Sequence, residues 1–277
     1  MGGVQSVISK LKTKVSHVHL SSFVTAVEVD HRLASLTYNQ AGGIHVDGGF
    51  HHIVFATEAH HAVPLLSRYA ASLSQATAMH KQAIRDQLEC MTCFKYCTTS
   101  VANHTDRTLL PSNAVDVRDL NLVISREGYH DQSCSEVCVS PSFTMATHVM
   151  WPPQGYLHLG PVFQTTNPIV APKTDHMLSH AKLQRAVLTL KAKEAVKGLY
   201  RQQARRWWND KDTDESKLGA LQGGGRLEDD GCPGIWICGS YAYPGIPLLE
   251  GCVVSSRHVV EDGIFQCEGV AAANLPW

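Results

Sequence analysis

The stretch from Gly234 to Gly263 reads GIWICGSYAYPGIPLLEGCVVSSRHVVEDG, and its order of patterns decides the fold. An apolar run, of the kind found in buried strands, ends at Gly239. A turn rich in proline and glycine follows. A helix is predicted from about Leu249 to Gly263. A strand, a loop and a helix in this order predict an α/β fold.

The start of the predicted helix has a chemistry of its own. Helix N-termini present unpaired N–H groups and a positive dipole end, which suit an anionic or electron-rich group. Gly251 lacks a side chain, so a flat ring could lie close to the backbone there. A reduced flavin carries negative charge at one edge and would be stabilised in this position. The alternative is an ordinary helix whose glycine serves close packing.

The chain before this stretch supplies strands first and helices later. Apolar spacing predicts an amphipathic helix over 4–15. Alternating and apolar segments predict strands at 18–20, 23–29, 36–38, 43–46 and 52–57. Further on we expect helices around 62–66, over 70–88 and over 184–199, a strand at 96–101, and loop-rich chain at 110–161 and 201–226.

These elements predict a mixed α/β (α+β) fold with two domains. Residues 1–57 and 227–277 are expected to form a mostly β domain, in which strands 53–56 and 235–238 share one sheet. Residues 58–226 are expected to form a separate lobe with a sheet and several helices.

Composition narrows the class of partner. The chain has 277 residues, 44% of them hydrophobic, and a formal net charge of -1 without long basic or acidic runs. Nucleic-acid binding through a charged surface is therefore not expected. The sequence shows no signal peptide and no apolar run long enough to span a bilayer, so we expect a cytoplasmic protein without membrane contact. The nine cysteines are then expected to be reduced thiols.

Metal binding is not predicted from the cysteines and histidines. Cys90 and Cys93 form one CxxC pair, whereas a structural zinc site needs a second pair. His51, His52, His60 and His61 flank one strand-like segment, which makes a metal cluster conceivable. Because no acidic residue falls at a familiar ligand spacing among them, surface and loop histidines are the preferred interpretation.

Residues 236–263 resemble the C-terminal FAD-contacting motif of the flavin amine oxidase family. In that family a strand ends in glycine and a polar pair, and a later Glu-Gly opens a helix beneath the isoalloxazine ring. The resemblance implies that Gly239 and Ser240 lie on the ribityl and pyrophosphate side. It implies that the helix start contacts the flavin pyrimidine ring through Leu249, Glu250, Gly251, Cys252 and Val253.

Three further segments resemble the same family in the same order. Gly2-Gly3-Val4 is similar to its Gly-Gly motif. Residues 17–27 are similar to a strand pair in which a valine backbone contacts adenine, and Val24 is the match. Residues 53–57 are similar to the strand that returns to the FAD domain. The resemblance, closest to fungal members, implies a partial FAD-binding fold with a substrate-binding lobe.

Two departures from the family affect the site. The family has an acidic residue where this chain has Tyr241, which could still donate a hydrogen bond. Tyr241 and Tyr243 are also candidates for lining a substrate site, and packing is the alternative role of each. The glycine-rich G-x-G-x-x-G loop of a dinucleotide site does not occur. We therefore expect the chain alone to bind FAD weakly or not at all. A complementing Rossmann segment or chain would be its partner.

The resemblance implies an FAD-dependent oxidoreductase that acts on a C–N or related bond of a small molecule. Three origins fit the missing loop: a fragment of a longer enzyme, which the start at Gly2-Gly3 favours; a short protein that has lost flavin binding; and half of a two-chain enzyme. Such enzymes hold a water near flavin N5 with a lysine, for which Lys95 is the candidate, and no other catalytic residue is assigned. The alternatives are a cofactor-free remnant that binds or cyclises a small apolar metabolite, and an inert fragment.

Overall fold

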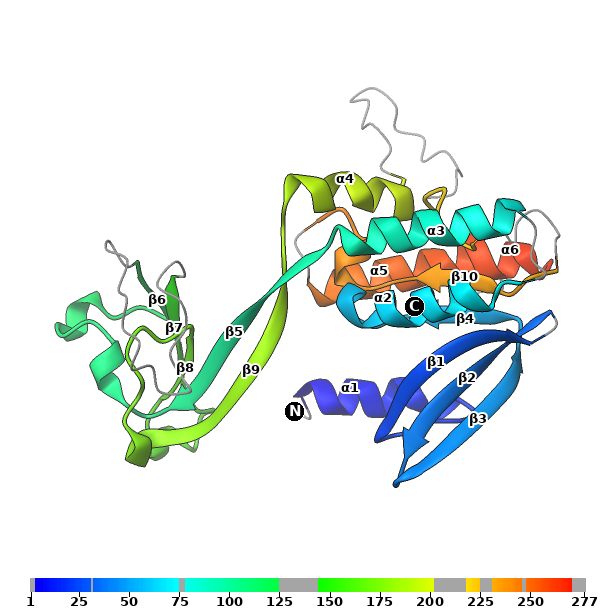
Figure 1. Cartoon of the computed structure of the whole chain (residues 1–277). Helices are drawn as coiled ribbons and strands as arrows, with labels where there is room; N and C mark the ends of the chain where they lie inside the picture. Colours follow the sequence, from blue (N-terminus) through cyan, green and yellow to red (C-terminus); the bar gives the residue numbers. More distant parts are fainter. Residues whose placement is uncertain are drawn as a thin grey trace. The chain divides into compact units, whose positions relative to one another are not determined.

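The computed structural model describes residues 3–30, 32–74, 78–124, 144–201, 218–224, 231–245 and 248–270. Helices and sheets both occur, so the predicted mixed α/β class is confirmed (Figure 1). The chain divides into two compact units. The first comprises Met1–Lys95 and Leu188–Trp277, and the second comprises Tyr96–Val187. These boundaries differ from the predicted ones at 57 and 227. The helices that follow residue 58 pack on strands and on one another within the first unit.

The first unit begins with a helix and an antiparallel sheet. Helix α1 (Gly3–Leu11) continues into a 3-10 turn, η1 (Lys12–Lys14), as the apolar spacing predicted. The sheet contains β1 (Ser22–Asp30), β2 (Leu33–Gln40) and β3 (Gly43–Phe50) in that order. Residues 18–20 do not form the predicted strand. Instead of pairing through its backbone, this segment accepts a side-chain hydrogen bond from β2, in which the Gln40 amide donates to the Leu20 carbonyl at 3.1 Å.

A parallel strand pair joins the two ends of the chain. Strand β4 (His52–Phe55) pairs with β10 (Gly234–Ile237), with Ile53 opposite Ile235. This confirms the prediction that strands 53–56 and 235–238 share a sheet. All four residues of β10 are buried, as its apolar run required.

The edge of β10 that faces away from β4 is bonded by glutamine side chains and by one glycine. Gln222 accepts from the Ile237 N–H at 2.9 Å and donates to its carbonyl at 2.7 Å. Gln87 donates to the Ile235 carbonyl at 2.9 Å. Gly223, whose φ is +82°, exchanges backbone hydrogen bonds with Ile235. These bonds satisfy buried backbone groups that a third strand would otherwise pair.

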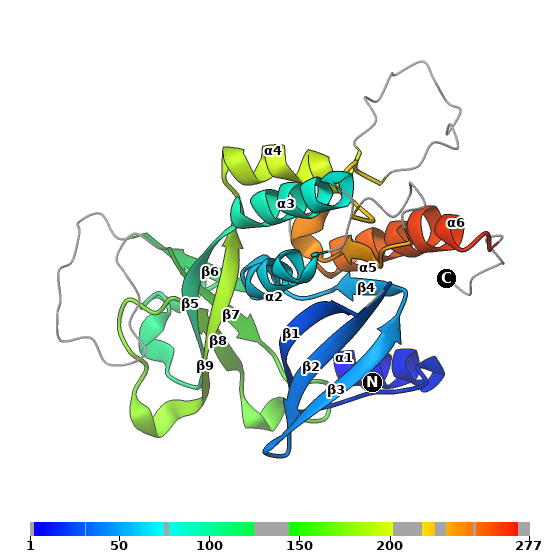
Figure 2. The ribbon, with the colours of Figure 1, turned by 45° about the vertical axis from the view of Figure 1, so that its right-hand side comes forward.

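Helices make up the rest of the first unit. They are α2 (Ala59–Ser72), α3 (Ala78–Thr92), α4 (Leu190–Leu199), α5 (Leu249–His258) and α6 (Phe265–Cys267), with a π-helical turn, η8 (Val259–Ile264), between the last two. The single helix predicted over 70–88 is thus two helices, since α2 ends at Ser72. Helices α2 and α3 contact each other, and Figure 2 shows α3 above α2.

Trp236 is the largest side chain that is fully buried, and it organises the packing between β10 and the C-terminal helical segment. Cys238 and Val259 pack with it in one cluster, against which Leu218 lies. The Trp236 indole N–H donates to His52 Nδ1 at 3.0 Å. The absence of a side chain at Gly263 makes room for the indole, because a Cβ there would lie 2.4 Å from the ring.

The second unit is built on a five-stranded sheet in the order β6-β7-β8-β5-β9. Its strands are β5 (Lys95–His104), β6 (Leu120–Val123), β7 (Met145–Met150), β8 (Val162–Thr166) and β9 (Met177–Val187). The helix predicted over 184–199 is wrong in its first part, because 184–187 completes β9. Gln184 donates to the Thr98 hydroxyl on neighbouring β5 at 3.1 Å, so sheet pairing overrides its helical propensity.

Asp106 fastens two loops of this second unit. Its carboxylate accepts from the Thr108 N–H at 3.0 Å, from the Thr108 hydroxyl at 2.8 Å and from the Lys173 N–H at 2.9 Å. Burial acts to raise the pKa of this carboxyl, but the hydrogen bonds outweigh it and hold the pKa at about 2. The ionised form is therefore the one that stabilises the fold.

Asp106→Asn is expected to lower the free energy of unfolding by about 2 kcal/mol at neutral pH. Because the folded pKa lies below the ordinary value of 3.8, the contribution is present above about pH 4 and is lost as the pH falls towards 2. Urea unfolding at several pH values measures this directly. The difference between wild type and variant should shrink as the pH falls, and a constant difference would contradict the prediction.

Candidate functional site

The carboxyl ends of the parallel strands β4 and β10 meet at one edge. The Cys238 N–H donates to the Phe55 carbonyl at 3.0 Å, and the Tyr241 hydroxyl donates to the Thr57 carbonyl at 3.0 Å. The turns that follow the two strands are therefore fastened side by side. Ligands of α/β proteins bind outside this edge of a parallel sheet, so it is the first place to seek a site.

Ser255 ties the start of α5 to the turn after β10. Its hydroxyl lies 2.7 Å from the Gly251 carbonyl and accepts from the Gly239 N–H at 3.0 Å. The side chain is buried, with 4% exposure. A single hydroxyl thus fixes the position of the helix relative to the strand. No sequence pattern singles out Ser255, because its hydrogen-bond partners are defined only by the placement of the strand and the helix.

The first turn of α5 presents an exposed surface. Leu249 is 72% exposed and Val253 is 64% exposed, and Glu250 lies between them in the same exposed turn. The first N–H groups of a helix have no carbonyl partner four residues earlier in the helix, although the Gly251 N–H donates to the Leu248 carbonyl at 3.0 Å. Leu248 at the N-cap supplies no side-chain hydrogen bond. This predicted contact surface is therefore accessible to a ligand, with apolar side chains beside polar amides.

Gly239 and Gly251 both allow close approaches, but the approaches are to protein. Gly239 has φ +143°, and a Cβ there would lie 3.1 Å from the Tyr241 ring. A Cβ at the buried Gly251 would lie 3.2 Å from Tyr243 Cβ and 3.4 Å from Ser240 Cα. The missing side chain of Gly251 predicted room for a flat ring beside the backbone. The structure gives this space to Tyr243 and Ser240, in agreement with the packing alternative.

The two tyrosines proposed to line a substrate site differ in exposure. Tyr241 is buried, and its ring lies edge-on to Phe94 with centroids 5.0 Å apart. Tyr243 is half-buried and contacts Tyr200, with centroids 5.5 Å apart. Burial, followed by Tyr243 and Asp262, raises the pKa of Tyr200, so this phenol is neutral at physiological pH. Tyr241 therefore serves packing, and Tyr243 is the better placed of the two to meet a ligand.

Two predicted residues lie on other elements. Val24 is half-buried in β1, opposite Tyr38 and beside a bulge, so it belongs to the antiparallel sheet. Lys95 is exposed at the start of β5, directly after Phe94. The described residues of 239–245 and 248–253 therefore lie close together, whereas Val24 and Lys95 belong to other elements, β1 and β5.

The cysteines near the site are not built for thiolate chemistry. Cys238 is buried, and burial raises its pKa, while Cys252 is half-buried. In the CxxC pair, burial and then Cys93 raise the pKa of Cys90 to about 12. Protonated, buried thiols are poor nucleophiles and poor metal ligands.

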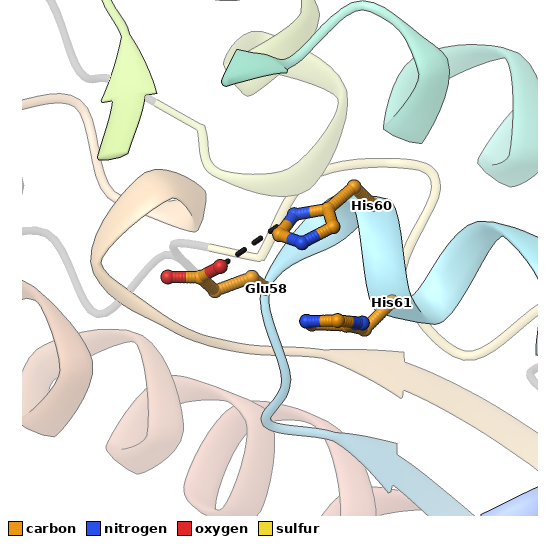
Figure 3. A group of neighbouring side chains, drawn as sticks. All are labelled: Glu58, His60 and His61. Carbon is orange, nitrogen blue, oxygen red and sulfur yellow. Dashed lines mark ion pairs between the residues drawn. The ribbon is translucent and has the colours of Figure 1, made fainter. Parts of the chain in front are cut away.

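The β4–α2 turn carries a cluster that sequence spacing did not reveal. Figure 3 shows Glu58, His60 and His61 gathered at this turn. Glu58 Oε2 lies 3.5 Å from His60 Nδ1, and the two imidazole centroids are 3.9 Å apart. In the sequence, no acidic residue falls at a familiar ligand spacing among these histidines. In the structure, Glu58 nevertheless lies beside His60 and His61.

No protein-family model and no curated protein matches this chain. Within the described residues, no helix combines the length and the apolar character needed to cross a membrane. The functional interpretation therefore depends on the geometry of the β4–β10 edge and of α5.

Proposed function

We propose that this chain supplies the flavin-ring side of an FAD-dependent oxidoreductase site of the amine oxidase type, which acts on a C–N or related bond of a small molecule. The supporting observation is the exposed first turn of α5, which Ser255 holds directly behind the end of β10. A cofactor-contacting helix must be both accessible and fixed, and this turn is both.

The residues of this turn fit a flavin ring better than a phosphate. Leu249 and Val253 offer apolar contact to a ring face, and the first amides of α5 offer donors to its polar edge. Glu250 places a carboxylate in the first turn, which offsets part of the positive helix end. A phosphate carries up to two negative charges and would be repelled more strongly by this carboxylate than the edge of an oxidised flavin ring, which carries no net charge.

In such a site the cofactor and the protein have separate roles. A bound flavin supplies the acceptor for a hydride, and the protein orients the substrate and excludes water. Leu249 and Val253 would cover one part of the ring, and the half-buried Tyr243 would lie behind the helix start. Ser255 would act as a positioning residue through the backbone of Gly239 and Gly251.

A flavin titration tests the proposal. If the chain contributes ring contacts without a phosphate cradle, FAD and riboflavin should bind weakly and with similar affinity, as measured by quenching of flavin fluorescence. Leu249→Asp should abolish the saturable response. The matched control is Leu190→Asp, which changes an exposed leucine at the first position of α4 and should bind as wild type does. No saturable response in wild type, or equal binding by Leu249→Asp, would refute the proposal.

A further inference from the structure

Three potential metal ligands converge where β4 passes into α2. Glu58 is the N-cap of α2, and His60 and His61 lie in its first turn. One ligand atom from each side chain can be chosen so that all three lie within 4.8 Å of one another. Figure 3 shows the carboxylate directed towards the His60 ring, with the His61 ring close by.

The convergence of these three side chains is unusual for residues so close together at the start of a helix. Neighbouring residues of a helix project in different directions and do not ordinarily face each other. Here the His60 and His61 rings lie with centroids 3.9 Å apart and planes inclined by 41°. Glu58 makes no side-chain hydrogen bond to the helix it caps and lies beside His60 instead. The three side chains therefore share one location.

We propose that Glu58, His60 and His61 bind a divalent metal ion of the zinc class. Two imidazoles and one carboxylate form a ligand set that zinc accepts, with a remaining position for water. Ligand atoms that each lie about 2 Å from an ion are at most about 4 Å apart, so atoms within 4.8 Å need only small side-chain rotations to close on it.

The surrounding electrostatics are compatible with a cation. The N-terminus of a helix carries partial positive charge, which disfavours a metal ion, and the Glu58 carboxylate counters it. Burial, and then His61, lower the pKa of His60 against the opposing effect of Glu58.

A second histidine pair in the same chain shows what a non-binding arrangement looks like. His52 Nε2 contacts Glu268 Oε1 at 2.7 Å, and His52 Nδ1 accepts from the Trp236 indole. Both ring nitrogens are thus occupied by protein. His51 precedes His52 in the chain, as His60 precedes His61, so His51 provides a matched control.

The proposed ion would stiffen the turn beside the candidate flavin edge. The carbonyl of Thr57, directly before Glu58, accepts from the Tyr241 hydroxyl. A metal held at 58–61 would thereby fix the acceptor that fastens the β10 turn. The binding itself does not depend on the flavin proposal, since all three ligands belong to β4–α2.

Cobalt titration of the purified full chain tests the site, because Co²⁺ replaces Zn²⁺ and reports its ligands. We expect one Co²⁺ per chain, with visible d–d bands, without the near-ultraviolet charge-transfer band of a thiolate ligand, and displaced by Zn²⁺. His60→Ala and His61→Ala should each weaken binding at least about 100-fold, since removing even a hydrogen-bond partner of a metal ligand costs about 10–100-fold. Glu58→Gln keeps the side-chain shape and should also weaken binding.

The controls separate this site from the other histidines and cysteines of the chain. His51→Ala should bind Co²⁺ as wild type does, and circular dichroism should show that every variant is folded. Absence of stoichiometric binding in wild type overturns the proposal. So does binding that survives in both His60→Ala and His61→Ala, or a spectrum dominated by thiolate charge transfer.

Discussion

Trp236→Ala is expected to lower the free energy of unfolding of the first unit by about 3–5 kcal/mol. Trp236 is fully buried and is the largest such side chain described. Its removal leaves a cavity between β10 and the C-terminal helical segment. It also removes the hydrogen bond to His52. Thermal unfolding followed by circular dichroism measures the loss, and a change below about 1 kcal/mol would show that the cluster collapses around the gap.

Gly263 allows the same packing to be tested in the opposite direction. Gly263→Ala alone should destabilise the protein by about 1–3 kcal/mol, because the new methyl would lie 2.4 Å from the indole. In the Trp236→Ala background the methyl has room, so the two effects should not add. Additive losses would mean that Gly263 and the indole are not in the described contact.

Gly251→Val is expected to destabilise the unit by about 3 kcal/mol, near the upper end for overpacking. A Cβ at this buried position already lies 3.2 Å from Tyr243 and 3.4 Å from the backbone of Ser240. The branched side chain of valine must displace one or both. If Gly251 served only to admit a flat ring, the same change would remove flavin and leave the fold largely intact. The contacts of Gly251 with Tyr243 and Ser240 instead predict a loss of folding stability.

Measuring thermal stability without flavin decides between these outcomes. Gly48→Val in β3 is the matched control, because a Cβ there meets only Ser35 Cβ at 3.6 Å and the residue is exposed. A lower melting temperature for Gly251→Val but not for Gly48→Val supports packing. An unchanged melting temperature for Gly251→Val would return Gly251 to the role of admitting a ligand.

The sequence predicted those elements whose patterns are local and strong. The apolar runs at 53–57 and 234–238 bounded β4 and β10, and their small or glycine ends placed the turns correctly. Their pairing followed because buried strands need partners. The helix predicted over 184–187 was wrong for the opposite reason. Gln184, Arg185 and Ala186 are good helix formers, and only their neighbours on β5 hold them extended. Helix propensity depends on the local sequence and takes no account of a neighbouring strand about 80 residues away in the chain.

The candidate site was predictable in outline and not in detail. The strand–turn–helix order of 234–258 was readable from glycines, prolines and apolar spacing. The clamp by Ser255 and the packing partners of Gly251 depend on how a turn of about ten residues folds back, which no spacing rule specifies. The gathering of Glu58 with His60 and His61 likewise depends on side-chain directions at a helix start.

The glutamines along β10 have a consequence for how this protein associates with other chains. A strand at the edge of a sheet ordinarily offers a template for a further strand, in assembly or in aggregation. On the side away from β4, the N–H and C=O groups of Ile235 and Ile237 are already bonded to Gly223, Gln87 and Gln222. Growth of the sheet is blocked in that direction. An incoming parallel strand, including one that carries a phosphate-binding loop, would have to add alongside β4.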